Sequence, residues 1–242
     1  MKVFSIVALL FVGLGATVAT HLSNCGAFQC EEFSPMRQLQ EIRKFPNSEQ
    51  VKELCPIALK YIECIINTTK ECTGMSIEEL MLNESLSEAD RFVVSVGRLL
   101  VDLCDEDSSF HKDYMASADC VWRVIDEEPN PECKLQGIKR GTEFLNAMGI
   151  SPEEMDENQR AEINCLEMPA TVACITSYLQ RHCGEAARRA VLHVVREFKP
   201  VIQQECSSDN VLKLKRDFLD YLNLDDEEKH VYHSVFEILK RR

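Results

Sequence analysis

Apolar residues recur at every third or fourth position along several stretches of the chain, which is the spacing of one face of a helix. Polar residues such as Lys60 and Glu63 occupy the opposite face of the clearest stretch. The apolar stripe of that stretch consists of Val51, Leu54, Cys55, Ala58, Ile62 and Ile65. The sequence lacks both the strict alternation of a strand and the Asn-Gly or Asp-Gly pairs of a tight hairpin. The pattern therefore predicts an all-α protein.

Two helix starts are predicted from local chemistry. Proline lacks a backbone N–H and is tolerated mainly in the first turn of a helix, so we expect a helix to begin near Pro56. The run Ser151-Pro152-Glu153-Glu154 combines a capping residue, a proline and early acids, which is typical of a helix N-terminus. A second helix is therefore expected to begin at Ser151.

The tail at residues 207–242 has no cysteine and shows the same helical spacing. Two helices are predicted within 211–239, the second beginning with acids at 225–228 and ending in basic residues at 240–242, as the helix dipole favours. Their apolar residues are Val211, Leu214, Phe218, Tyr221 and Leu222, then Val231, Tyr232, Val235, Phe236 and Leu239. Exposed faces of this kind promote association. We expect a helix pair that docks on the body and acts separately from it, with a dimer contact through 211–239 as the alternative.

The chain contains twelve cysteines, an even number. They are Cys25, Cys30, Cys55, Cys64, Cys72, Cys104, Cys120, Cys133, Cys165, Cys174, Cys183 and Cys206. No Cys-x2-Cys step or Cys/His cluster of the kind that holds zinc occurs among them. Six disulfides in an oxidising compartment are therefore expected, and no metal site.

The cysteines fall into two similar groups of six. The triplet Cys55-x8-Cys64-x7-Cys72 is matched by Cys165-x8-Cys174-x8-Cys183. A cysteine pair precedes each triplet, and a Val/Leu-rich stretch ending in cysteine follows it. The repeat predicts a disulfide-stapled helical bundle with duplicated units at 20–104 and 120–206, a polar hinge at 105–119 and the helical tail.

Helix geometry limits which cysteines can pair. Cys55 and Cys64 are nine residues apart, which is roughly 13 Å along a helix axis, and they lie on opposite faces. A disulfide needs Cα atoms within about 7 Å. We therefore expect neighbouring cysteines of a triplet to bond to other elements, and all disulfides to stay within their own half.

The first residues indicate secretion. Residues 1–19 combine one lysine, an apolar run and small residues up to Ala19, which is the layout of a cleaved signal peptide. No later segment is apolar enough to span a membrane. The net charge of −13 disfavours nucleic acid and anionic membrane surfaces as partners. The sequence predicts a secreted, extracellular protein.

Candidate sites for chemistry are few. Asn67-Thr68-Thr69 and Asn83-Glu84-Ser85 match the acceptor motif for N-glycosylation. His230 and His233 are three residues apart but have no further ligand nearby in the sequence, so we interpret them as surface histidines. No nucleophile elbow, zinc-protease motif or phosphate-binding loop is found. We predict no catalytic residue, no cofactor and no enzymatic activity.

The cysteine ladder and its surroundings resemble the arthropod 27 kDa haemolymph glycoprotein family. The similar segments are ELCPIALKYIECIINTTKEC, RLLVDLC with Cys120 and Cys133 after it, and INCLEMPATVACITSYLQRHC up to Cys206. The resemblance covers about residues 40–206 and leaves the tail outside. It implies a soluble, glycosylated haemolymph protein without an assigned active site.

Two functions remain open from the sequence. The first is a carrier or binding protein for a small apolar ligand, because disulfide-stapled helical bundles can enclose apolar cavities. The density of Val, Leu and Ile at 92–100 and 191–202 favours such a cavity in at least one half. The alternative is a structural, storage or immune-interaction protein with a solid core.

Overall fold

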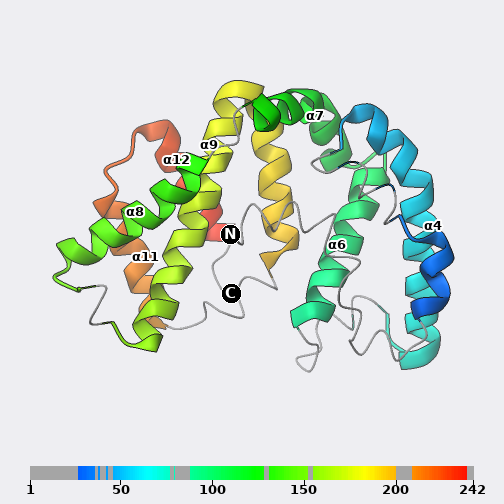
Figure 1. The fold of residues 1–242 in the computed structure, drawn as a ribbon, viewed down its shortest axis with the longest axis horizontal. Helices are drawn as coiled ribbons and strands as arrows, with labels where there is room; N and C mark the ends of the chain where they lie inside the picture. Colours follow the sequence, from blue (N-terminus) through cyan, green and yellow to red (C-terminus); the bar gives the residue numbers. More distant parts are fainter. Residues whose placement is uncertain are drawn as a thin grey trace. The chain divides into compact units, whose positions relative to one another are not determined.

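The computed structural model describes residues 27–35, 46–76, 88–127, 131–151, 155–199 and 209–238, with the single positions 38, 42 and 79. The described part is helical and contains no strand, which confirms the all-α prediction (Figure 1). Two compact units divide the chain at Trp122 and Arg123. No helix in the described ranges is long and apolar enough to cross a membrane.

Unit 1 contains the 3-10 helix η2 (Ala27–Phe33) and the helices α4 (Ser48–Thr73) and α6 (Glu88–Cys104), together with most of α7 (Ser109–Glu127). Helix α4 packs against both η2 and α6. Its buried face consists of Val51, Leu54, Ala58, Ile62 and Thr69. The helical stripe predicted from the sequence is therefore the face that α4 buries.

Helix α4 starts earlier than Pro56 suggests. Asn47 caps it by accepting a hydrogen bond from the backbone N–H of Gln50, whose side chain accepts one from the backbone N–H of Asn47. Pro56 therefore lies inside the helix, and the expected start near Pro56 is wrong. Pro56 is exposed, so the carbonyl that loses its helical partner is on the side that water can reach.

Helix α7 occupies most of the segment predicted as a polar hinge. Only residues 105–108 are non-helical, and the boundary between the units falls within α7 rather than before it. Tyr114 of α7 donates a hydrogen bond to the carbonyl of Pro46 at 2.7 Å, and Asp119 accepts one from the backbone N–H of Ser48 at 3.2 Å. Polar composition therefore did not distinguish a helix from a loop here.

Unit 2 contains α8 (Pro131–Ala147), α9 (Glu157–Glu197), α11 (Asp209–Tyr221) and α12 (Asp226–Ile238). Helix α9 is interrupted at Gly184, which has φ 81° and ψ −176°, a conformation that suits glycine because a Cβ would be strained there. The chain bends back at this residue (Figure 1). Residues 157–183 and 185–197 therefore form two arms.

The start of α9 differs from the sequence-based expectation. Asp156 is the N-cap, and it forms a reciprocal capping box with Gln159. Ser151 is not helical, and residues 152–154 lie outside the described residues. The predicted start at Ser151 is therefore wrong, because the capping chemistry of Asp156 and Gln159 decides the position.

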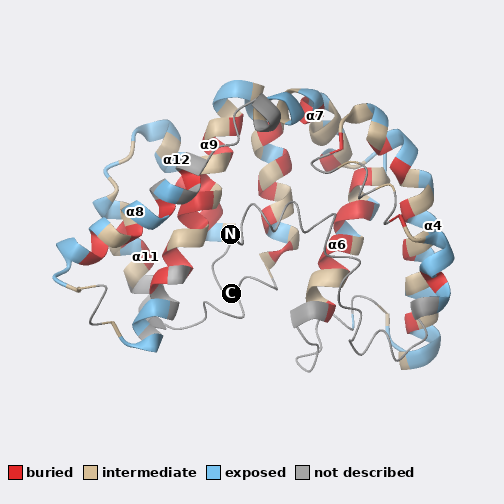
Figure 2. Cartoon of the chain, viewed as in Figure 1, coloured by how far each residue is buried: buried red, intermediate tan, exposed pale blue. Residues whose placement is uncertain are grey.

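The core of unit 2 joins all four helices, and buried residues gather where α8, α9 and α12 meet (Figure 2). Helix α9 has its most extensive packing with α12 and α8. The core residues of α11 and α12 are Phe218, Val231, Tyr232, Val235 and Phe236. The predicted helix pair of the tail is present and docked, but its side chains belong to the same core as α8 and α9. The expectation that the tail acts separately is therefore wrong.

Two glycines allow α8 and α9 to approach closely. A Cβ built on Gly137 would lie 2.3 Å from Thr171 Oγ1 and 3.1 Å from the carbonyl oxygen of Glu167, and one on Gly141 would lie 3.0 Å from Glu167 Cγ. Thr171 is buried, and its hydroxyl donates a hydrogen bond to the carbonyl of Glu167 at 2.8 Å. Side chains at these two positions would push the helices apart.

We expect Gly137→Ala to destabilise unit 2 by about 1–3 kcal/mol, because the added methyl group overpacks a buried contact. Gly97→Ala is the matched control, since it also replaces a helical glycine but meets nothing within 4 Å. That control should stabilise unit 1 by about 0.5–1 kcal/mol through helix propensity. Urea unfolding of both variants measures the two effects, and equal changes in the two would contradict the close packing of α8 and α9.

All ten cysteines in the described ranges are disulfide-bonded. The pairs Cys30–Cys64, Cys55–Cys104 and Cys133–Cys174 have Cα–Cα distances of 5.8, 5.3 and 5.5 Å. Helix α4 is therefore tied to η2 by Cys64 and to α6 by Cys55, as helix geometry predicted. Each of the three pairs joins cysteines of one predicted half. Cys25 and Cys206 lie outside the described residues.

Candidate functional site

Among the described side chains of unit 2, the exposed large hydrophobic residues lie on or next to α8. Leu135 is 62% exposed and Ile138 is 41% exposed, and the two are one turn apart on that helix. Met148 follows the end of α8 and is 47% exposed. Tyr221 of α11 is also exposed, and its ring centroid lies 5.5 Å from that of Phe144 in α8. We group these four residues by their exposure and their place on or beside α8, and call the group the α8 apolar face.

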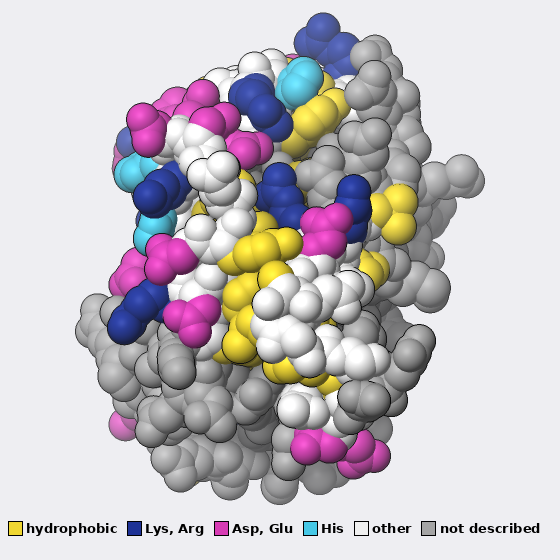
Figure 3. Space-filling view, turned by 90° about the vertical axis from the view of Figure 1, so that its left-hand side faces the viewer, with side chains coloured by type: hydrophobic (Ala, Val, Ile, Leu, Met, Phe, Trp, Pro, Cys, Tyr) yellow, Lys and Arg dark blue, Asp and Glu magenta, His cyan; other side chains and the backbone are white. Residues whose placement is uncertain are grey.

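Hydrophobic side chains gather toward the middle of the side of the molecule shown in Figure 3, with acidic and basic side chains around them. On α8 itself, Lys139 and Glu143 form an exposed ion pair at 3.7 Å. The core-facing residues of the same helix are Gly137, Gly141, Phe144 and Leu145. Helix α8 is thus held to the core on one side and presents apolar side chains to solvent on another.

Buried polar groups support the inner side of α8. Arg140 donates a hydrogen bond to the hydroxyl of Tyr232 in α12, and its guanidinium carbon lies 5.5 Å from the ring centroid. Burial raises the pKa of Tyr232, and the Arg140 charge opposes that shift. The pKa of Glu167, beside Gly141, is also raised by burial. These contacts connect α8 to α12 and α9, so they fix the position of the helix that carries the α8 apolar face.

Lys215 is the buried cation of α11. It is 7% exposed, and burial lowers its pKa while the charge of Glu237 in α12 opposes the shift. The aliphatic part of the Lys215 side chain contributes to the packing of α11, and its ammonium group remains near an acidic side chain. The burial of Lys215 and the nearby charge of Glu237 therefore indicate a structural role for this lysine.

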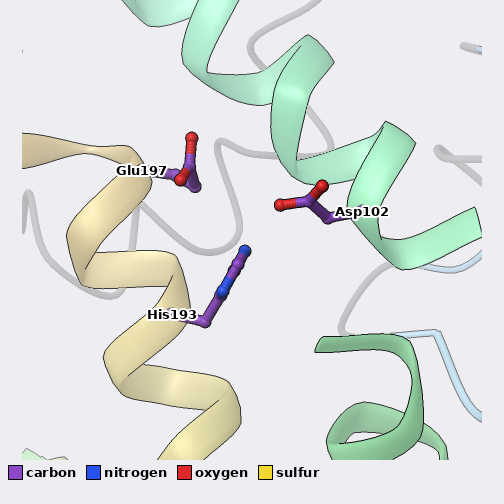
Figure 4. Close-up of side chains that lie close together, drawn as sticks. All are labelled: Asp102, His193 and Glu197. Carbon is purple, nitrogen blue, oxygen red and sulfur yellow. The ribbon is translucent and has the colours of Figure 1, made fainter. Parts of the chain in front are cut away.

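One turn of α9 brings together two side chains that metals bind. His193 and Glu197 are four residues apart on its second arm, and a ring nitrogen of His193 lies within 4.8 Å of a carboxylate oxygen of Glu197 (Figure 4). Asp102, also labelled there, projects from α6 of unit 1. The sequence analysis missed the His193–Glu197 pair, although its i, i+4 spacing was readable. Zinc sites use three or four protein ligands, so two from one helix do not by themselves make a site.

The histidines considered from the sequence do not form a cluster of ligands. His230 and His233 are both exposed on α12, as expected for surface histidines. The acidic run before them acts in capping, since Asp225 Oδ1 accepts a hydrogen bond from the backbone N–H of Glu228 at 2.8 Å. Acids at this end of a helix are stabilised by its dipole.

The two predicted glycosylation sites differ in what the structure describes. Asn67 lies on α4 with an exposed side chain, next to exposed Lys70. Asn83 lies outside the described residues. The exposure of Asn67 leaves room for a glycan on the folded protein.

The described part of the chain defines a disulfide-crosslinked, all-α protein with exposed apolar side chains on and beside α8. Comparison with known proteins finds no matching family model, no matching curated protein and no matching solved structure.

Proposed function

We propose that this protein is secreted and non-enzymatic, and that it binds a small apolar ligand on the α8 apolar face. The extracellular setting is supported by the disulfides, which persist mainly in oxidising compartments. A circulating fluid of haemolymph type is the setting that the sequence resemblance favours. The observation that carries the binding function is the set of exposed apolar side chains along α8.

The size of the face favours a small ligand. Four side chains, each about half exposed, offer on the order of 400 Å² if a large side chain presents about 200 Å². A stable protein interface buries about 800 Å² on each partner, which is roughly twice as much. The apolar cavity considered from the sequence stays a prediction.

The acidic charge bears on the chemistry of the ligand. The net charge of −13 repels anionic surfaces and polyanions. A neutral apolar molecule avoids that repulsion and gains by transferring apolar surface out of water. A fatty alcohol or a sterol-like molecule therefore fits better than a phosphorylated or nucleic-acid ligand.

The test is titration of the purified full chain with a neutral apolar fluorescent probe and with a fatty alcohol. The double variant Leu135→Asp/Ile138→Asp should weaken binding at least about tenfold, the effect of losing about 1.4 kcal/mol. Leu59→Asp/Ile66→Asp on α4 is the control, because it makes the same two replacements in unit 1, at residues that are 39% and 37% exposed. Unchanged binding in the α8 variant, or an equal loss in both, would exclude the α8 apolar face as the site.

We also propose that the two groups of six cysteines, at 20–104 and 120–206, derive from one duplicated element. The N-cap residue of the capping box in α4 lies eight residues before Cys55. The N-cap residue of the capping box in α9 lies nine residues before Cys165. In both groups of six, the second cysteine pairs with the fourth, as Cys30–Cys64 and Cys133–Cys174. The repeat seen in the cysteine spacing therefore extends to capping and to one pairing.

This duplication predicts the remaining connectivity by analogy. Cys55–Cys104 pairs the third cysteine with the sixth, so Cys165 should pair with Cys206. Cys72 is disulfide-bonded, and the order of cysteines in the first half predicts Cys25 as its partner. Peptide mapping of the unreduced, thiol-blocked protein by mass spectrometry measures both pairs. A bond from Cys165 to any cysteine other than Cys206 would refute the duplicated connectivity.

A further inference from the structure

The acceptor motif Asn67-Thr68-Thr69 lies near the end of α4, where its residues have very different surroundings. Asn67 is exposed. Thr69 is 1% exposed, and its hydroxyl has no hydrogen-bond partner in the part of the chain that the structure describes. Thr68 Oγ1 lies 3.8 Å from the sulfur of Cys30, in the disulfide with Cys64. The folded protein therefore presents the asparagine and hides the hydroxyl that completes the motif.

Helix geometry explains this separation. Successive residues of an α-helix are rotated by about 100°, so residues two apart point in nearly opposite directions. In an extended chain, residues two apart point to the same side. An enzyme that requires asparagine and a hydroxyl two residues later must contact both side chains. A helical Asn67–Thr69 segment cannot offer them together.

We propose that Asn67 is glycosylated only before α4 folds and that closure of the Cys30–Cys64 disulfide ends its availability. The inference rests on the proposed secretion, which exposes the chain to the glycosylation machinery. The donor is a lipid-linked oligosaccharide. A bond forms between Asn67 Nδ2 and the anomeric carbon, the bond from that carbon to the diphosphate oxygen breaks, the amide loses a proton, and the lipid diphosphate leaves.

The order of residues along the chain identifies the competing disulfide. Cys30 and Cys64 both precede Asn67, so they are available to pair as soon as the acceptor motif is synthesised. Cys55 must wait for Cys104, which is separated from it by 49 residues. Cys30–Cys64 also holds η2 against the turn of α4 that carries the motif. Glycan addition at Asn67 must therefore precede formation of this crosslink. A glycan already attached fits the folded surface.

The decisive experiment compares transfer to the folded and the unfolded full chain. Asn83→Gln leaves Asn67 as the one acceptor motif, and unglycosylated protein is prepared in two forms, oxidised and folded, or reduced and thiol-blocked. Each is incubated with purified oligosaccharyltransferase and lipid-linked oligosaccharide, and the Asn67 peptide is quantified by mass spectrometry. Transfer to the unfolded form should be at least about tenfold faster, because the folded chain must first open α4. Equal transfer to both forms, or transfer to neither, would overturn the proposal.

A cellular experiment identifies the disulfide and separates this inference from the proposed secretion. In secretory cells treated with a low dose of an inhibitor of donor synthesis, Cys30→Ser/Cys64→Ser should raise occupancy of Asn67 above that of the parent. Cys133→Ser/Cys174→Ser, which removes one disulfide from unit 2, should leave it unchanged. Equal occupancy in all three chains would overturn the role of Cys30–Cys64. Failure of the parent chain to enter the secretory pathway would refute the proposed secretion. The transfer experiment with purified oligosaccharyltransferase would still test whether Asn67 is glycosylated only before α4 folds.

Discussion

A chain that ends after Cys206 should lose the folded structure of unit 2 and keep that of unit 1. The truncation removes Phe218, Val231, Tyr232, Val235 and Phe236, which are five of the thirteen buried residues described in the core of unit 2. Burial of each such side chain contributes about 1.5–3 kcal/mol, so the loss is on the order of 10 kcal/mol. That is comparable to the whole stability of an ordinary domain.

The measurement is amide hydrogen exchange of the truncated and full chains, followed segment by segment. Exchange in α8 and α9 should become fast, whereas exchange in α4 and α6 should change little. Phe218→Ala is a milder version that should cost unit 2 about 3–5 kcal/mol, because Phe218 is fully buried. Phe33→Ala is its control, since Phe33 is 39% exposed. If the truncated chain keeps the protection of α8 and α9, the C-terminal helices are not part of the core.

Removing the Cys133–Cys174 disulfide should destabilise unit 2 by about 4 kcal/mol, the loop-closure value for a separation near 40 residues. The double variant Cys133→Ser/Cys174→Ser leaves no unpaired thiol. The single variant Cys174→Ser should be worse, because it leaves the thiol of Cys133, which is 1% exposed, without a partner in a buried place. Chemical unfolding of the variants, with secretion yield as a second readout, measures the effect.

Cys55→Ser/Cys104→Ser is the reciprocal control, since it removes a crosslink with a separation of 49 residues from unit 1. Each double variant should destabilise its own unit and leave hydrogen exchange in the other unchanged. A Cys174→Ser protein that is secreted normally and melts like the parent would show that this crosslink is not needed for folding.

The helical class, the buried stripe of α4 and the bonding of its cysteines to other elements all follow from the sequence pattern. These features depend on local geometry, since a helix with cysteines nine residues apart cannot join them to each other. The two C-terminal helices followed from the same periodicity. The surface position of His230 and His233 also agreed with expectation, because both lie on the polar side of α12.

Local rules were less successful at helix limits and connections. The proline rule predicts a helix start near Pro56, but the exposed position of Pro56 lets α4 accommodate it. Composition predicts a hinge in the polar segment after Cys104, but Tyr114 and Asp119 form hydrogen bonds with Pro46 and Ser48, before and at the start of α4. Both outcomes depend on contacts with residues far away in the sequence, which composition does not report.

Tertiary structure alone decided which apolar faces are covered. Leu135 and Ile138 have the same apolar chemistry as Leu145 of the same helix, but only Leu145 is buried in the core. The close approach of α8 and α9 at Gly137, and the merging of the C-terminal helices with the core of unit 2, are likewise products of packing. Periodicity reveals that a helix has an apolar side. Which part of that side meets another helix and which part meets water depends on the positions of elements that are distant along the chain.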